Sequence, residues 1–105
     1  MQIRVQTFTV HKRFALTISR GTTAQTTNLW VCIDHDGVEG WGEASPFSIG
    51  EHPQTTETLA RSLQRIAPLL KALSPWERQR IERLMVESGL PSGARAALDL
   101  ALWDW

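Results

Sequence analysis

The stretch from Asp36 to Pro46, DGVEGWGEASP, constrains the fold more than any other part of the chain. Its first two residues, Asp36-Gly37, predict a two-residue β-hairpin turn, because a type I′ turn needs positive φ at both central positions. Gly40 and Gly42 share one face of the strand that follows, and glycines there typically mark the close approach of another backbone. That face also carries Val38 and Ala44, whereas the opposite face carries Glu39, Trp41 and Glu43. We therefore expect a hairpin with another element lying flat against its glycine face.

The first half of the chain predicts a small antiparallel sheet. The segment before the turn, Leu29–Ile33, is β-branched and aromatic, as a strand should be. Ser19–Asn28 is polar and contains a glycine, which predicts a long loop, and such loops are often functional. The strands are expected near residues 2–12, 26–34 and 38–44.

The first strand shows a change in parity. Ile3 and Val5 share one face, whereas Phe8 and Val10 fall on the other. A bulge or twist near Gln6-Thr7 would bring all four side chains to one side.

Beyond residue 53 the period of the apolar residues changes from two to 3.6, which predicts helices. Pro68 is expected to end or kink the first helix. The residues Ser74–Glu77, SPWE, form a capping-box pattern that predicts the start of a second helix, and Gly89 predicts its end. The stripe of the first helix is Leu59, Leu63, Ile66 and Leu70, and that of the second is Ile81, Leu84 and Met85.

The third predicted helix, residues 93–105, follows Pro91 and is expected to be capped by Ser92. It is apolar around most of its circumference, which predicts burial on all sides. Since little chain is left to bury it, we expect either a partner chain or a longer protein, and we favour a chain truncated before a further domain. The expected exposed apolar patch comprises Leu98, Leu102, Trp103 and Trp105.

Composition narrows the function classes. The 105 residues suit one domain. Eleven basic and 11 acidic residues give a formal net charge of zero, which argues against a nucleic-acid partner. Cys32 is the single cysteine, so an intramolecular disulfide is excluded and a reducing compartment is expected. The sequence shows no secretory signal pattern and no apolar run long enough for a membrane span. We therefore expect a cytoplasmic protein without a membrane partner.

Several motifs together resemble the N-terminal capping domain of the enolase superfamily, in its muconate-lactonising (mandelate racemase/muconate cycloisomerase-like) branch. The resemblance covers essentially the whole chain, in the right order. Within the branch, Ser-Arg-Gly-Thr at 19–22 is most similar to dipeptide epimerases that act on L-Ala-D/L-Glu-like substrates. Besides the N-terminal strand, the motifs are FALTISRGT at 14–22, DGVEGWGEASP at 36–46, Gly-Glu at 50–51 and ARAALDLALWD at 94–104.

The resemblance implies an α+β domain, a three-stranded antiparallel meander followed by about three helices. It would occupy residues 1–105, with the sheet in 1–45 and the helices in 54–105, and would cap a catalytic (β/α)-barrel that this chain lacks. In the family, barrel lysines take a proton from the carbon next to a carboxylate, through an enediolate, and barrel acids hold a magnesium ion. Lys12 and Lys71 lack the family's Lys-x-Lys spacing. We therefore expect no catalytic residue and no metal ligand in this chain, which alone should be inactive.

The resemblance also implies the partners and the binding residues. In the family, two cap loops close over the barrel mouth and select a carboxylate substrate, here a dipeptide. They correspond to residues 16–25 and 45–52. Arg20 is the candidate for a distal carboxylate, because a guanidinium binds carboxylates bidentately, although a solvated loop arginine is the alternative. A homo-oligomer is compatible with the resemblance. The other expected pocket residues are Ile18, Thr22, Phe47 and Ile49.

Other polar residues have simpler interpretations. Glu39 and Glu43 could form an acid–base pair, but glutamates two positions apart on a strand are usually the wet side of a sheet. The three histidines are dispersed, which argues against a histidine metal site. Asp99 and Asp104 are expected to cap or to pair with Arg95 rather than to bind metal.

Two alternative functions stay open. The first is the cap of a muconate-type cycloisomerase or an o-succinylbenzoate synthase, which share the same domain. The second belongs to another class, a non-catalytic stand-alone domain that binds a partner chain through its apolar last helix. Sequence beyond Trp105 would distinguish them, because only the enzyme continues into a barrel with the lysine and acidic signature.

Overall fold

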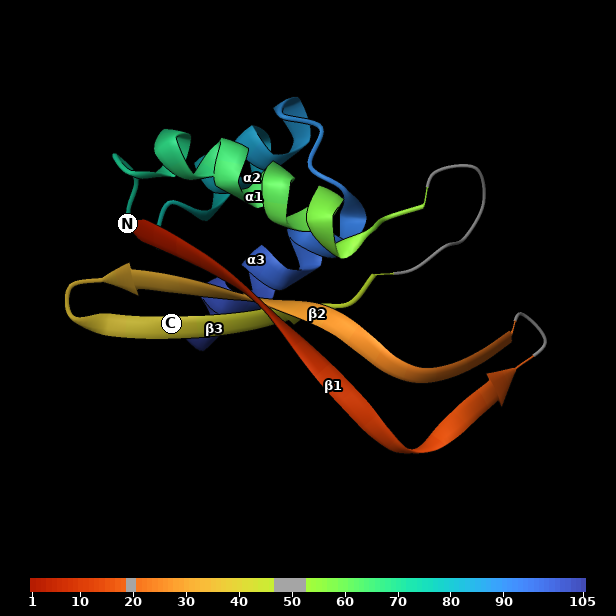
Figure 1. Ribbon diagram of the computed structural model, residues 1–105. Coiled ribbons are helices and arrows are strands. Elements are labelled where there is room, and N and C mark those ends of the chain that lie inside the picture. The colour runs from red at the N-terminus through yellow and green to blue at the C-terminus, as the bar shows by residue number, and fades with distance from the viewer. Residues whose placement is uncertain (19–20, 47–52) are drawn as a thin grey trace.

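Three antiparallel strands and three helices make up the fold (Figure 1). The computed structural model describes residues 1–18, 21–46 and 53–105. The strands pair in the order β1-β2-β3, and the helices cover one face of this sheet (Figure 1). The predicted α+β class with a three-stranded meander is confirmed. The elements are β1 (Gln2–Ile18), β2 (Gly21–His35), β3 (Val38–Ala44), α1 (Thr56–Leu70), α2 (Arg78–Glu87) and α3 (Ser92–Asp104).

The strands β1 and β2 are longer than predicted. Residues 21–28 belong to β2, so the expected loop over residues 19–28 is wrong there. The sequence of this stretch is rich in threonine, whose β-branched side chain favours strands although it is polar. The two strands therefore continue beyond β3 as a two-stranded arm (Figure 1).

The predicted bulge near Gln6-Thr7 is also wrong. Pairing is continuous from Gln2 opposite Asp34 to His11 opposite Gln25. The register shifts further along, between His11 and Leu16. No switch of face is needed at Phe8, because its ring packs on the outer face of the sheet against Trp30, with centroids 4.5 Å apart.

The hairpin between β2 and β3 is confirmed in detail. Asp36 and Gly37 both have positive φ, 54° and 73°. A Cβ at Gly40 would collide with the backbone oxygen of Ala101, and one at Gly42 would lie 2.9 Å from the carbonyl carbon of Ala97. The glycine face of β3 therefore lies directly against the backbone of α3.

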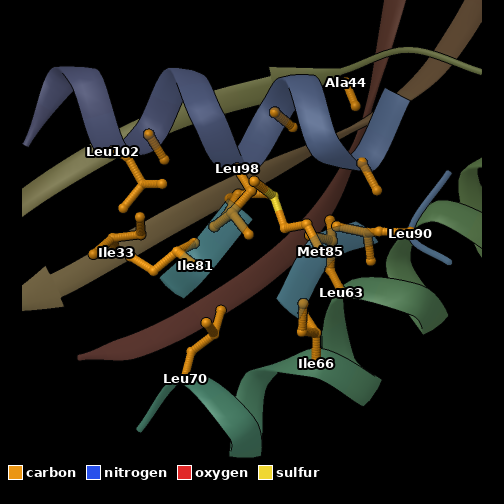
Figure 2. Close-up of a cluster of buried hydrophobic side chains, with 14 of the residues drawn as sticks. Ile33, Ala44, Leu63, Ile66, Leu70, Ile81, Met85, Leu90, Leu98 and Leu102 are labelled. Carbon is orange, nitrogen blue, oxygen red and sulfur yellow. The ribbon is translucent and has the colours of Figure 1, made fainter. Parts of the chain in front are cut away.

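The core lies between the sheet and the helices (Figure 2). The predicted stripe of α1 is fully buried. However, α1 runs through Pro68 to Leu70 instead of ending just before Pro68. Proline this close to the end disturbs only the last turn, and Leu70 is completely buried there, which favours keeping that turn. The largest fully buried side chains include Leu29, Ile33, Leu59, Leu63, Ile66, Leu70, Ile81 and Leu98.

The second helix begins later than its capping box suggests. Glu77 accepts a hydrogen bond from the Ser74 backbone N–H at 2.8 Å, as the pattern predicts. The Ser74 hydroxyl, however, accepts from the N–H of Trp76 (3.3 Å), so these residues form a separate turn before Arg78. Gly89 ends the helix as predicted, with φ of 63° and a Leu90 N–H bond to the Met85 carbonyl.

The third helix differs from its prediction in burial. Leu98 and Leu102 belong to the core, 0% and 5% exposed, so the expected exposed patch is wrong for these two residues. Leu100 and Trp103 are 55% and 74% exposed, so the helix is not buried on all sides. The sheet covers one side of α3 because the glycines of β3 let the helix approach closely.

Candidate functional site

The segments that flank both predicted loops lie at one end of the molecule. The end of β1 and the start of β2 flank the first loop, the end of β3 and the start of α1 flank the second, and all four lie on the side away from the β2–β3 turn (Figure 1). Ile18 pairs with Gly21, and Thr22 pairs with Thr17. Nothing in the structure therefore tests the expected pocket, because Arg20, Phe47, Ile49 and the side chains of Ile18 and Thr22 lie outside the described residues.

The base of the second loop is attached to the rest of the domain on both sides. Before the loop, the Asn28 amide donates to a Glu43 carboxylate oxygen at 2.9 Å, joining β2 to β3. After it, Gln54 spans to the start of α3, where its Oε1 accepts from the Gly93 N–H and its Nε2 donates to the Ser92 hydroxyl, both at 2.9 Å. The predicted capping of α3 by Ser92 is wrong, because Ser92 is the first helical residue and Gln54 supplies the acceptor.

Two threonines hold the segment after Gln54. The Thr55 hydroxyl caps α1 by accepting from the Thr58 N–H at 3.0 Å. The Thr56 hydroxyl donates to the Thr27 carbonyl of β2. Three consecutive residues, 54–56, thus attach this segment to both β2 and α3. The sequence analysis did not predict these contacts. One signal was available, because a helix that follows Pro91 has no capping side chain at that position and needs an acceptor from elsewhere in the chain.

The outer face of the sheet carries a cluster of interacting side chains. Arg4 pairs with Glu39 at 3.1 Å and donates to the Cys32 sulfur at 3.2 Å. The hydrogen bond to Cys32 raises the pKa of Arg4, and burial raises the pKa of the Cys32 thiol. Trp30 and Trp41 meet edge to face, 5.9 Å apart. Glu39 pairs with Arg4 of β1, and Glu43 accepts a hydrogen bond from Asn28 of β2, so the structure favours the structural interpretation over an acid–base pair.

The two acidic residues of α3 also have structural partners. Asp99 pairs with Arg78 at 2.6 Å, not with Arg95 as predicted. A carboxylate oxygen of Asp104 accepts from the Trp41 N–H at 2.8 Å, which joins the end of α3 to β3. Across the described ranges, no group of three or more His, Cys, Asp or Glu side chains could hold a metal ion.

One side of α3 is apolar and exposed. Ala96, Leu100 and Trp103 recur at helical spacing and are all exposed. The Arg78 guanidinium lies 4.8 Å from the Trp103 ring centroid. We call Ala96, Leu100 and Trp103 the outer stripe of α3. It faces away from the domain's own core.

The chain matches the family described as "Mandelate racemase / muconate lactonizing enzyme, N-terminal domain" over residues 2–105. The chain belongs to this family. The predicted resemblance to the enolase superfamily cap is thereby confirmed.

Two curated relatives are epimerases. The chain is 35% identical over 105 residues to the hydrophobic dipeptide epimerase of Flavobacteria bacterium (strain MS024-2A), covering 100% of this chain and 29% of the relative. It is 34% identical over 89 residues to the L-Ala-D/L-Glu epimerase of Escherichia coli (strain K12), covering 83% of this chain and 25% of the relative. The chain thus spans less than a third of the length of these relatives.

A solved structure has the same fold. It is the dipeptide epimerase from Enterococcus faecalis V583 complexed with Mg and the dipeptide L-Leu-L-Tyr. The superposition has a TM-score of 0.87 at 24% identity and covers 97% of this chain and 29% of that chain. Separately, none of the helices in the described ranges is long and apolar enough to cross a membrane.

Proposed function

We propose that residues 1–105 are the substrate-selecting cap of a magnesium-dependent dipeptide epimerase. The observation that carries the proposal is the family match over residues 2–105 together with the two epimerase relatives. Support from the fold is that the strand and helix ends flanking the two expected binding regions lie at one end of the domain (Figure 1).

The catalytic groups and the metal ligands of this enzyme would lie outside these residues, in a barrel domain. Leu100 and Trp103 give a surface on which a further domain of the same protein could pack. We expect residues 1–105 alone to leave a dipeptide unchanged. A cytoplasmic location, suggested by the single cysteine, is part of the same proposal.

The proposed substrate is an L-Ala-D/L-Glu-type dipeptide. Arg20 lies between the last residue of β1 and the first of β2, and a guanidinium there could bind the side-chain carboxylate of the substrate. A hydrophobic dipeptide is the second candidate, because the relative from Flavobacteria bacterium is a hydrophobic dipeptide epimerase. The two candidates differ in charge, so the substitution of one arginine distinguishes them.

The test compares kcat/KM for L-Ala-L-Glu and L-Leu-L-Tyr in the full-length protein and its Arg20→Gln variant. If Arg20 binds the distal carboxylate, the variant loses about 100-fold on L-Ala-L-Glu and changes little on L-Leu-L-Tyr. Arg61→Gln, an exposed arginine of α1, is the matched control and should change neither. Equal effects on both dipeptides would exclude Arg20 as the ligand of the distal carboxylate, and full activity on L-Leu-L-Tyr alone would favour the hydrophobic class.

The other functions predicted from the sequence are separable in the same assay. Cycloisomerase or o-succinylbenzoate synthase activity would appear with the corresponding substrates and not with dipeptides. A non-catalytic binding domain would show no turnover in the full-length protein. The two epimerase relatives favour the dipeptide reaction over both.

A further inference from the structure

The N-terminus of α3 lacks a cap from its own sequence. Its N-cap residue is Pro91, which makes no side-chain hydrogen bond, and the helix begins at Ser92. The first N–H groups of a helix have no partner within the helix and need an acceptor from elsewhere. Ala94, two residues into the helix, is fully buried, so this end lies against the core.

Gln54 supplies that acceptor from 39 positions away in the sequence. Its carbonyl oxygen accepts from the Gly93 N–H, and its amide nitrogen donates to the Ser92 hydroxyl, so both ends of the side chain are used. Gly93 makes room for it, since a Cβ there would lie 2.9 Å from Gln54 Oε1 and 3.2 Å from a methyl carbon of Leu59. The contact is therefore built from three segments, the residue itself, α1 and α3.

Gln54 lies at the base of the second cap loop, so its contact with α3 bears on the position of that loop base. It follows the second cap loop, 45–52, and comes directly before the Thr55 cap of α1 and the Thr56 bond to β2. Loss of its side chain would leave those threonine contacts in place but would free the chain from α3.

We propose that Gln54 is a positioning residue for substrate binding, which ties the base of the second cap loop to the N-terminus of α3. The inference rests on the proposed function for its effect on substrate. The attachment itself is a property of the domain and can be measured without any substrate.

The test uses the full-length protein with Gln54→Ala, Gln54→Glu and, as matched control, Gln64→Ala. Gln64 is an exposed glutamine of α1. The glutamate variant keeps an acceptor for Gly93, can accept from the Ser92 hydroxyl, and places a negative charge at a helix N-terminus, where it is favourable. It should therefore rescue what the alanine variant loses.

Two readouts are needed. Hydrogen–deuterium exchange should become about fivefold faster or more over residues 44–56 and 92–95 in Gln54→Ala, and should stay unchanged in Gln64→Ala and Gln54→Glu. In dipeptide epimerisation, Gln54→Ala should raise KM about five- to tenfold with kcat within about twofold. A merely unfolded fraction would instead lower the apparent kcat at unchanged KM.

The outcomes are separable. Faster exchange confined to residues 92–95 would make Gln54 a helix cap only and overturn the proposal, as would an unchanged KM in an active Gln54→Ala enzyme. If the wild-type protein epimerises no dipeptide, the proposed function fails, and with it the role in substrate binding. The exchange over residues 44–56 still decides whether Gln54 holds the loop base.

Discussion

Replacing Gly42 by alanine tests the close contact between β3 and α3. A Cβ at this position would collide with the carbonyl oxygen of Ala97 and lie 2.9 Å from its carbon and 3.0 Å from the backbone nitrogen of Ala101. These obstacles are helix backbone, so no side chain can rotate away and the whole of α3 must retreat. A gap of about 0.5–1 Å forfeits a quarter to a half of the dispersion energy at each contact it opens.

The expected loss is about 3 kcal/mol in the free energy of unfolding, at the upper end for overpacking. The opposing terms are smaller, because an added buried methyl gains about 0.8 kcal/mol and the loss of glycine flexibility in the unfolded chain about 0.4–1 kcal/mol. Urea unfolding followed by far-UV circular dichroism measures the change, with the m-value as a check on two-state behaviour.

Gly89→Ala is the matched control for this experiment. A Cβ at Gly89 meets nothing within 4 Å, but φ is +63°, so the variant carries only the cost of a left-handed backbone, about 1 kcal/mol. An account based on strand propensity alone predicts that Gly42→Ala stabilises the protein. A Gly42→Ala variant as stable as the wild type, or no less stable than Gly89→Ala, would refute the close-contact argument.

Three further changes have defined outcomes. The hydrogen bond from the Ser74 backbone N–H holds the pKa of Glu77 below its ordinary value. The contribution of the ionised Glu77 to the free energy of unfolding is therefore present at neutral pH and is lost as pH falls through the folded-state pKa. The stability curves of wild type and Glu77→Gln should converge in acid, and a constant gap between them would contradict this. Burial raises the pKa of Cys32, so Ellman's reagent should modify it about tenfold more slowly in the folded protein than in urea, and equal rates would show the thiol to be accessible. Asp104→Ala should lower the free energy of unfolding by about 1 kcal/mol, because the hydrogen bond from the Trp41 backbone N–H is lost. Asp104→Asn keeps an acceptor for this N–H and should lose less. Equal losses in the two variants would exclude that bond as the cause.

The features that sequence could predict are those decided by neighbouring residues. The β2–β3 turn has positive φ at both Asp36 and Gly37, and the dipeptide Asp-Gly is by itself typical of such a turn. The leucine stripe of α1 and the Gly89 stop of α2 follow from helical periodicity and from the left-handed backbone that ends a helix. Gly40 and Gly42 also predicted the close approach of another element, because two glycines on one strand face typically mark it, although they did not identify that element as α3.

The features that escaped prediction depend on residues far apart in the chain. Gln54 caps α3 by accepting from the N–H of Gly93, 39 positions away, and no local pattern identifies this partner. Leu98 and Leu102 were expected to be exposed because the covering sheet could not be placed against the helix from periodicity alone. The predicted bulge would have turned Phe8 toward the core. Its ring instead packs against Trp30, which lies on the outer face of the neighbouring strand. The binding loops depend on the resemblance, and their side chains lie outside the described residues.

Exchange of the dipeptide α-proton in D₂O, followed by proton NMR with magnesium present, tests whether this domain caps a dipeptide epimerase. The full-length protein and residues 1–105 alone are each incubated with L-Ala-L-Glu and L-Leu-L-Tyr. We expect the full-length protein to exchange the α-proton and to form the epimer of at least one dipeptide, whereas residues 1–105 alone should do neither. Exchange by the isolated chain, or no exchange of either dipeptide by the full-length protein, would contradict the claim that this domain is the cap of a dipeptide epimerase.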